Sequence, residues 1–156
     1  MQLETTRFGA IDVPENAVIT FTQPILGFQE HRRFVLLPGP GHFLKWLQST
    51  DSGELAFILM DPRSVVSDYA IKLTVHDLTE LGASDATEIE VYTLVVVPRD
   101  PAKVRTNLKA PIVLNPKQRL AKQIVLENSD YPVQFYLVEA QKNTENQEVA
   151  DARTNS

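Results

Sequence analysis

The feature that most constrains the fold of this chain is a series of short runs rich in β-branched and aromatic residues. Proline, glycine, asparagine and aspartate separate the runs, and these residues favour turns over the interior of regular elements. Runs of this kind predict β-strands joined by short connections. The predicted strands cover residues 6–13, 18–21, 33–37, 43–48, 55–60, 88–97, 103–108, 112–114, 120–126 and 133–138.

One segment, residues 75–81, has the pattern of a helix. The side chain of Thr74 is placed to cap its first turn, and Asp77 stands three residues later, in the position of the second partner of a capping box. Gly82 follows the segment and can adopt the left-handed backbone conformation that ends many helices. The sequence therefore predicts a short helix with a defined start and a defined end.

Many short strands and a single short helix predict a mostly β fold, a compact antiparallel β-barrel-like or sandwich domain. Alternating strands and helices, which would indicate a parallel nucleotide-binding sheet, do not occur in the pattern. We expect one domain over residues 1–138, because a chain of 156 residues suits a single domain. Residues 139–156 are polar, with Val149 as the one sizeable apolar side chain, and we predict a disordered tail there.

Charge is distributed unevenly along the chain, which has a formal net charge of −5. Residues 51–100 contain 10 acidic and 3 basic residues, whereas residues 101–125 contain 6 basic residues and no acidic one. If the fold keeps these segments apart, one face is acidic and attracts a basic partner. If the fold mixes them, the surface is an ordinary solvated one. The negative net charge argues against nucleic acid as a direct ligand.

The sequence contains no arrangement typical of an active site or a metal centre. There are no cysteines, and the 3 histidines lack the spacing of a helical zinc site. It has neither a Gly-x-Ser-x-Gly elbow nor a glycine-rich phosphate loop. The acid pairs Asp61/Asp68 and Glu88/Glu90 could do acid–base work, but we interpret them as an outward-facing acidic rim. We therefore expect no enzyme, no metal and no cofactor.

Nothing in the sequence indicates export or membrane insertion. No apolar run approaches the roughly 18 residues of a membrane span. Residues 1–4 show neither the basic start nor the apolar core of a signal peptide. We expect a cytoplasmic protein with no membrane partner, and the lack of cysteine fits that compartment.

Two predicted strands, residues 55–60 and 88–97, are apolar on both faces, although a strand with one solvated face should alternate. The second face of each must be covered, either by the protein itself or by a partner. An apolar patch bounded by acidic residues is typical of a site for a protein segment. The alternate residues that share one face of the second strand are Glu88, Glu90, Tyr92, Leu94 and Val96.

An ordered set of short motifs runs through the chain from residue 3 to residue 138. In its order and density, this set resembles the FliW family of bacterial flagellar assembly factors. Leu26 stands where the family often has proline, and that difference concerns a turn. The set includes Thr6-Arg7-Phe8-Gly9, Ile25-Leu26-Gly27-Phe28, Arg32-Arg33-Phe34-Val35-Leu36, Trp46-Leu47-Gln48-Ser49, Asp61-Pro62, Asp68-Tyr69, Asn107-Leu108-Lys109-Ala110-Pro111, Asn115-Pro116 and Ser129-Asp130-Tyr131-Pro132-Val133.

The resemblance implies a cytoplasmic, non-enzymatic binding protein with a compact β-barrel-like fold. FliW-like proteins bind flagellin, the filament subunit, before its export. They also bind CsrA, a small RNA-binding repressor of translation. Flagellin that awaits export occupies the FliW-like protein, and export releases it to antagonise CsrA and relieve the repression of flagellin translation. We expect a monomer when no partner is bound.

The residue types suggest where the two partners bind. CsrA binds RNA phosphates and so carries a basic surface, which acidic residues complement. The terminal segments of flagellin are amphipathic helices, which suit an apolar groove. Two other classes stay open: a small-ligand carrier, which a large interior pocket would favour, and an enzyme built on isolated carboxylates. The predicted binding residues are Asp61, Asp68, Glu88 and Glu90 for CsrA, and Tyr92, Leu94 and Val96 for flagellin.

Overall fold

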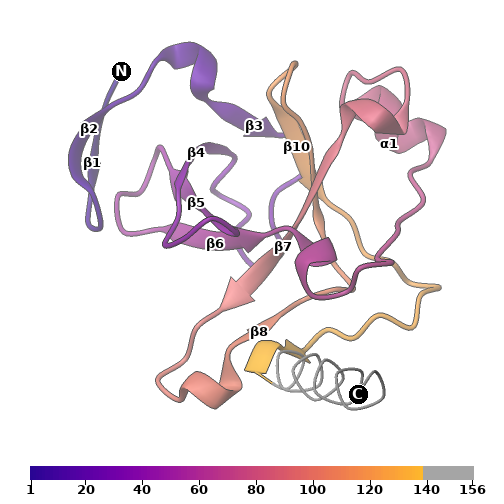
Figure 1. The fold of residues 1–156 in the computed structure, drawn as a ribbon. Helices are drawn as coiled ribbons and strands as arrows, with labels where there is room; N and C mark the ends of the chain where they lie inside the picture. The colour runs from indigo at the N-terminus through magenta and orange to yellow at the C-terminus, as the bar shows by residue number, and fades with distance from the viewer. Residues whose placement is uncertain (139–156) are drawn as a thin grey trace, which may run out of the picture.

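A closed β-barrel is the centre of the computed structural model, which describes residues 1–138 (Figure 1). Seven strands form the barrel in the order β7-β6-β5-β4-β3-β10-β9, and β9 pairs back with β7 to close it. Neighbouring strands are antiparallel, except that β3 and β10 are parallel. The barrel strands are β3 (Ile19–Phe21), β4 (Arg33–Pro38), β5 (Leu44–Ser49), β6 (Ala56–Met60), β7 (Glu90–Val96), β9 (Ile112–Asn115) and β10 (Leu120–Gln123).

Two smaller groups of strands extend from the barrel. A hairpin of β1 (Gln2–Thr5) and β2 (Gly9–Asp12) forms a separate two-stranded sheet near the N-terminus. The short strands β8 (Arg105–Thr106) and β11 (Phe135–Tyr136) continue the main sheet beyond β7. Short 3-10 helices occupy four connections: η1 (Glu15–Ala17), η2 (Pro62–Ser64), η3 (Ala86–Glu88) and η4 (Pro101–Lys103).

The predicted helix is confirmed as α1 (Val75–Glu80). The Asp77 N–H donates to Thr74 Oγ1 at 3.0 Å, and the Thr74 N–H donates to the Asp77 carboxylate at 2.9 Å. This capping box satisfies two N–H groups that the first turn would otherwise leave without partners. Gly82 follows the helix with φ +67°, a conformation that glycine adopts without steric cost.

The predicted mostly β fold with one short helix is confirmed, and the barrel is the alternative that forms. The first predicted strand, residues 6–13, is wrong at its start because a turn lies there. The Phe8 N–H donates to Thr5 Oγ1 at 2.9 Å, and Gly9 has φ +68°. Strand β1 precedes this turn and was missed, since its four residues are too few for their alternation to stand out from a loop.

Several later strands are shorter than predicted. Residues 88–97 begin in the 3-10 helix η3, so the strand starts at Glu90. The run 103–108 reduces to β8, because Pro101 fixes the backbone of η4 just before it. Runs 120–126 and 133–138 likewise reduce to β10 and β11.

Side chains from all seven barrel strands fill the barrel interior. The ring centroids of Phe21 and Phe34 lie 5.2 Å apart, and those of Phe34 and Phe57 lie 6.0 Å apart. A small-ligand carrier needs an open interior, so this packed interior does not favour that alternative. The buried members of the cluster are Ile19, Phe21, Ile25, Phe34, Leu47, Leu59, Tyr92, Ile112, Leu114 and Ala121.

A second apolar cluster covers the outer face of the barrel. Leu3 of β1 and Val13, which directly follows β2, pack with Val35 of β4. The protein itself therefore covers both faces of β4, as the packing of strands that are apolar on both sides requires. Within residues 1–138, no helix combines the length and the apolar character needed to cross a bilayer.

Replacing Phe34 by alanine should destabilise the protein strongly. Phe34 is 0% exposed at the centre of the core, and a Phe→Ala change in a core costs about 3–5 kcal/mol of unfolding free energy. Phe43→Ala is the matched control, because Phe43 is 71% exposed and its loss should change stability by less than about 0.5 kcal/mol. Urea unfolding followed by circular dichroism measures both, and equal effects would contradict this account of the core.

Candidate functional site

An acidic rim forms where β6 ends and β7 begins. Asp61 and Glu90 are exposed and line one surface hollow of ≈ 280 Å³ together with Tyr92 and the exposed Arg63. The Tyr92 hydroxyl donates to the Glu90 carboxylate, and Lys45 Nζ donates to the same hydroxyl at 3.2 Å. The Lys45 ammonium also lies 5.3 Å from the centre of the Tyr92 ring. The rim therefore combines exposed carboxylates with a fixed tyrosine behind them.

The surroundings keep the Tyr92 hydroxyl protonated. Burial raises the pKa of Tyr92 far above its usual range, and the Glu90 hydrogen bond and the charges of Glu90 and Asp61 raise it further. The hydroxyl therefore stays a hydrogen-bond donor and holds the Glu90 side chain in place. Asp61 is held separately, since its Oδ1 accepts from the Arg63 N–H at 2.9 Å at the start of η2.

The other two predicted acidic residues lie outside this hollow. Glu88 was expected to share a strand face with Glu90, and that expectation is wrong because Glu88 belongs to η3. Its carboxylate accepts hydrogen bonds from the N–H groups of Ser84 and Asp85 and so helps to cap the N-terminus of that helix. Asp68 is exposed in the connection between η2 and α1. The structure thus brings together Asp61 and Glu90 of the four predicted acidic residues.

The apolar groove expected from Tyr92, Leu94 and Val96 does not form, because this parity of β7 faces the barrel interior. Tyr92 belongs to the buried core, and Leu94 packs against that core. Val96 is 46% exposed because it lies past Val95, the last residue of β7 that pairs with β6. A binding role for these residues stays a prediction, and among the three only Val96 offers an exposed side chain.

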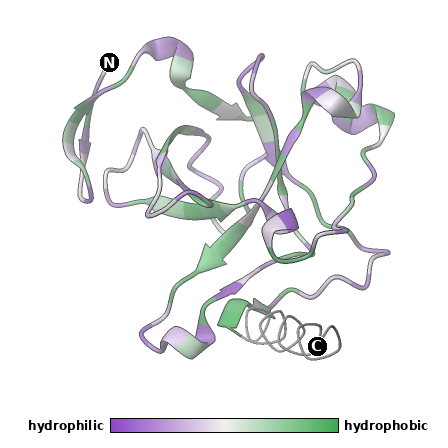
Figure 2. Cartoon of the chain, viewed as in Figure 1, coloured by the Kyte–Doolittle hydropathy of each residue, from purple (hydrophilic) through white to green (hydrophobic). Residues whose placement is uncertain are grey.

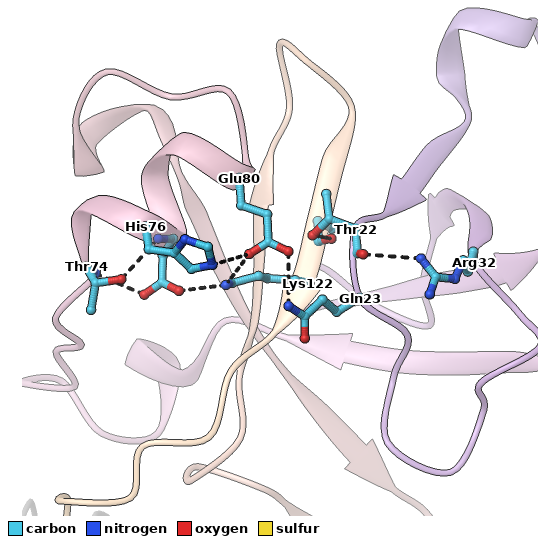
Figure 3. A network of polar contacts seen from close by, with 9 residues as sticks. Thr22, Gln23, Arg32, Thr74, His76, Glu80 and Lys122 are labelled. Atoms are coloured by element: carbon cyan, nitrogen blue, oxygen red, sulfur yellow. Dashed lines mark hydrogen bonds and ion pairs between the residues drawn. The ribbon is translucent and has the colours of Figure 1, made fainter.

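Reasoning from the sequence missed a buried charge network that joins α1 to the barrel (Figure 3). Lys122 on β10 is 5% exposed, and its Nζ lies 2.6 Å from Asp77 Oδ1 and 2.8 Å from Glu80 Oε2. Asp77 thus serves both the capping box and the ion pair. Glu80 also accepts a hydrogen bond from Gln23 at 3.2 Å, which connects the network to the chain that follows β3.

The network shifts the ionisation of all three charged groups. Burial alone would lower the pKa of Lys122, but the Asp77 and Glu80 carboxylates outweigh it and raise that pKa. Burial alone would raise the pKa of Asp77, but hydrogen bonds from Lys122 and Thr74 lower it below the usual 3.8. The hydrogen bond from Lys122 is the main reason that the pKa of Glu80 falls below 4.5.

An open groove of ≈ 750 Å³ lies beside this network. Exposed Leu26 and Val125 line it together with Lys72, Glu127 and Tyr131. Its lining mixes apolar and polar side chains, as in surfaces that contact other proteins. Within residues 1–138, no group of three or more histidine, aspartate or glutamate side chains is placed to hold a metal ion.

Replacing Lys122 by methionine should lower stability by about 3 kcal/mol, since it leaves two carboxylates without their counter-charge in a partly buried place. The effect should depend on pH. In the folded protein, the pKa values of Asp77 and Glu80 lie below their usual values of 3.8 and 4.5, so the two ionised carboxylates stabilise the fold at any pH above those usual values. This contribution is lost as the pH falls through the lower pKa values of the folded state. The difference in Tm between wild type and Lys122→Met should therefore shrink on acidification below about pH 4.5.

Lys117→Met is the control for this experiment, because Lys117 is exposed in the turn between β9 and β10. It should shift Tm little at any pH. A Tm difference for Lys122→Met that stays constant from neutral to acidic pH would contradict the role given to the ion pairs.

Comparison with known proteins places these features in a family context. The family model described as "FliW protein" matches residues 2–137. A flagellar assembly factor FliW from Geobacter sulfurreducens is 44% identical over 131 residues, which cover 84% of this chain and 82% of that protein. The one from Heliobacterium modesticaldum is 38% identical over 146 residues, with coverage of 93% and 95%. A crystal structure of the flagellar assembly factor FliW has a TM-score of 0.81 and 32% identity, and covers 88% of this chain and 96% of that one.

Proposed function

Because this chain belongs to the FliW family of flagellar assembly factors, we propose that it binds flagellin in the cytoplasm and antagonises the translational repressor CsrA. Antagonism relieves the repression of flagellin translation. The observation that carries the proposal is the match to the family over residues 2–137, nearly all of the described chain. The protein acts by binding other proteins, without catalysis, and is a monomer when no partner is bound.

The acidic rim supports a contact with CsrA. A protein that binds RNA phosphates carries basic surface, and Asp61 and Glu90 present exposed carboxylates at one place. Complementary charge mainly accelerates association and selects the partner. The exposed Asp68 extends the negative charge to the neighbouring connection.

Asp68→Lys should slow the association of CsrA more than it speeds dissociation. Asp68 is exposed and forms no ion pair with another residue among residues 1–138, so the change should leave the fold intact. Binding should also weaken as NaCl rises from about 0.1 M to about 1 M, because the Debye length falls from about 10 Å to about 3 Å. Surface plasmon resonance with purified CsrA measures both rates.

Glu4→Lys is a suitable control, since Glu4 is an exposed acid on the N-terminal hairpin, away from the acidic rim. Glu88→Lys is a poor probe because it would remove the hydrogen bonds that close η3. CsrA binding that responds to neither salt nor Asp68→Lys would move the interface to an apolar surface and defeat this part of the proposal.

The two partners should weaken each other's binding. A switch between flagellin and CsrA requires a coupling free energy, and linkage makes the coupling reciprocal. We expect flagellin to lower the affinity for CsrA by about tenfold or more, and CsrA to lower the affinity for flagellin by the same factor. Titrating flagellin into a preformed complex with CsrA, followed by calorimetry, measures it. A ternary complex with both affinities unchanged would exclude the switch.

A further inference from the structure

The chain between β7 and β8 projects from the barrel as an arm, which we define as residues 96–105 (Figure 1). Strand β7 pairs with β6 only as far as Val95, and beyond that point it pairs with β8 through Val96 and Arg105. The arm is therefore a hairpin that leaves the wall of the barrel. Figure 2 shows the end of β7 in the colour of hydrophobic residues.

Hydrogen bonds fix the arm at its base and at its tip. At the base, the buried Thr106 hydroxyl lies 2.8 Å from the Thr93 hydroxyl and 2.7 Å from the Leu94 carbonyl oxygen. At the tip, Asp100 Oδ1 accepts from the Ala102 N–H at 3.0 Å, at the start of the 3-10 helix η4. A surface that is ordered before binding loses less entropy when a partner docks.

The arm combines basic charge with exposed apolar side chains. Val96 is 46% exposed and Val97 is 57% exposed. Arg99 and Lys103 are also exposed, and neither takes part in an ion pair with another residue of the described chain. Lys103 Nζ lies 5.9 Å from the centre of the Tyr136 ring. Asp100, the one acid of the arm, is engaged in capping η4. The arm therefore has the opposite sign of charge to the acidic rim at the other end of β7.

We propose that the β7–β8 arm docks an acidic segment of a protein partner, with apolar side chains of that segment against Val96 and Val97. Complementary charge favours such a segment, and like charge disfavours a basic protein. The choice of partner rests on the proposed function, which gives the chain two partners, CsrA and flagellin. CsrA is basic where it binds RNA and would be repelled by a basic arm, so we assign the arm to flagellin. One strand then presents surfaces of opposite charge to two different proteins.

The test compares flagellin binding by the wild type and by the double variant Arg99→Glu/Lys103→Glu. We expect the double variant to bind flagellin at least about tenfold more weakly at about 0.1 M NaCl, with a smaller difference at about 1 M, because salt screens exposed charges. Its affinity for CsrA should stay within about twofold of the wild type. Val97→Ser should weaken flagellin binding at both salt concentrations, since the apolar contact is not screened.

The double variant Arg32→Glu/Lys117→Glu makes the same change in net charge at exposed positions outside the arm and should bind flagellin as the wild type does. Circular dichroism melting checks that all variants are folded. Equal loss of binding in both double variants, or none in the arm variant, would overturn the proposal. A change in the self-association of the free protein without a change in flagellin affinity would also overturn it. If the wild type itself does not bind flagellin, the proposed function fails. If the wild type binds flagellin and the arm variant binds it equally well, only the proposal about the arm fails.

Discussion

The whole structure depends on the double pairing of β7. This strand pairs with β6 along one edge and with β9 along the other, through Tyr92 opposite Ile112. The barrel closed in this way has no free edge between its seven strands, and it forces one parity of every strand inward. Closure therefore decides which side chains of β7 are core and which are surface. It buries Tyr92 and leaves Glu90 at one end of the strand and Val96 at the other.

Features that depend on neighbouring residues could be predicted from the sequence. The cap of α1 was predicted because Thr74 and Asp77 interact across a single turn of backbone. The sequence also predicted correctly that Tyr92, Leu94 and Val96 form an apolar face of β7. It did not predict that this face packs into the barrel interior, since the same residue pattern is expected for a face that contacts a partner. Glu88 was misplaced because its capping role competes with a strand pattern over the same residues.

Long-range electrostatics could not be predicted from the sequence. A count of charges along the chain treats Lys122 as part of a basic run, yet its partners Asp77 and Glu80 belong to the acidic segment. Their pairing removes charge from the surface and fastens the helix to the barrel. The surface that remains has an acidic rim and a basic arm, and neither corresponds to a whole segment of the chain.

The parallel pairing of β3 with β10 has a consequence for how the protein folds during its synthesis. It pairs residues from distant parts of the chain, such as Phe21 with Ala121. Closing so long a loop costs chain entropy before the strand contacts that offset it can form. During synthesis, the antiparallel strands from β3 to β7 leave the ribosome before β9 and β10, with two open edges and an apolar face that can aggregate. The barrel is sealed only when β9 and β10 arrive. Each new molecule therefore completes its barrel late, near the end of its own translation.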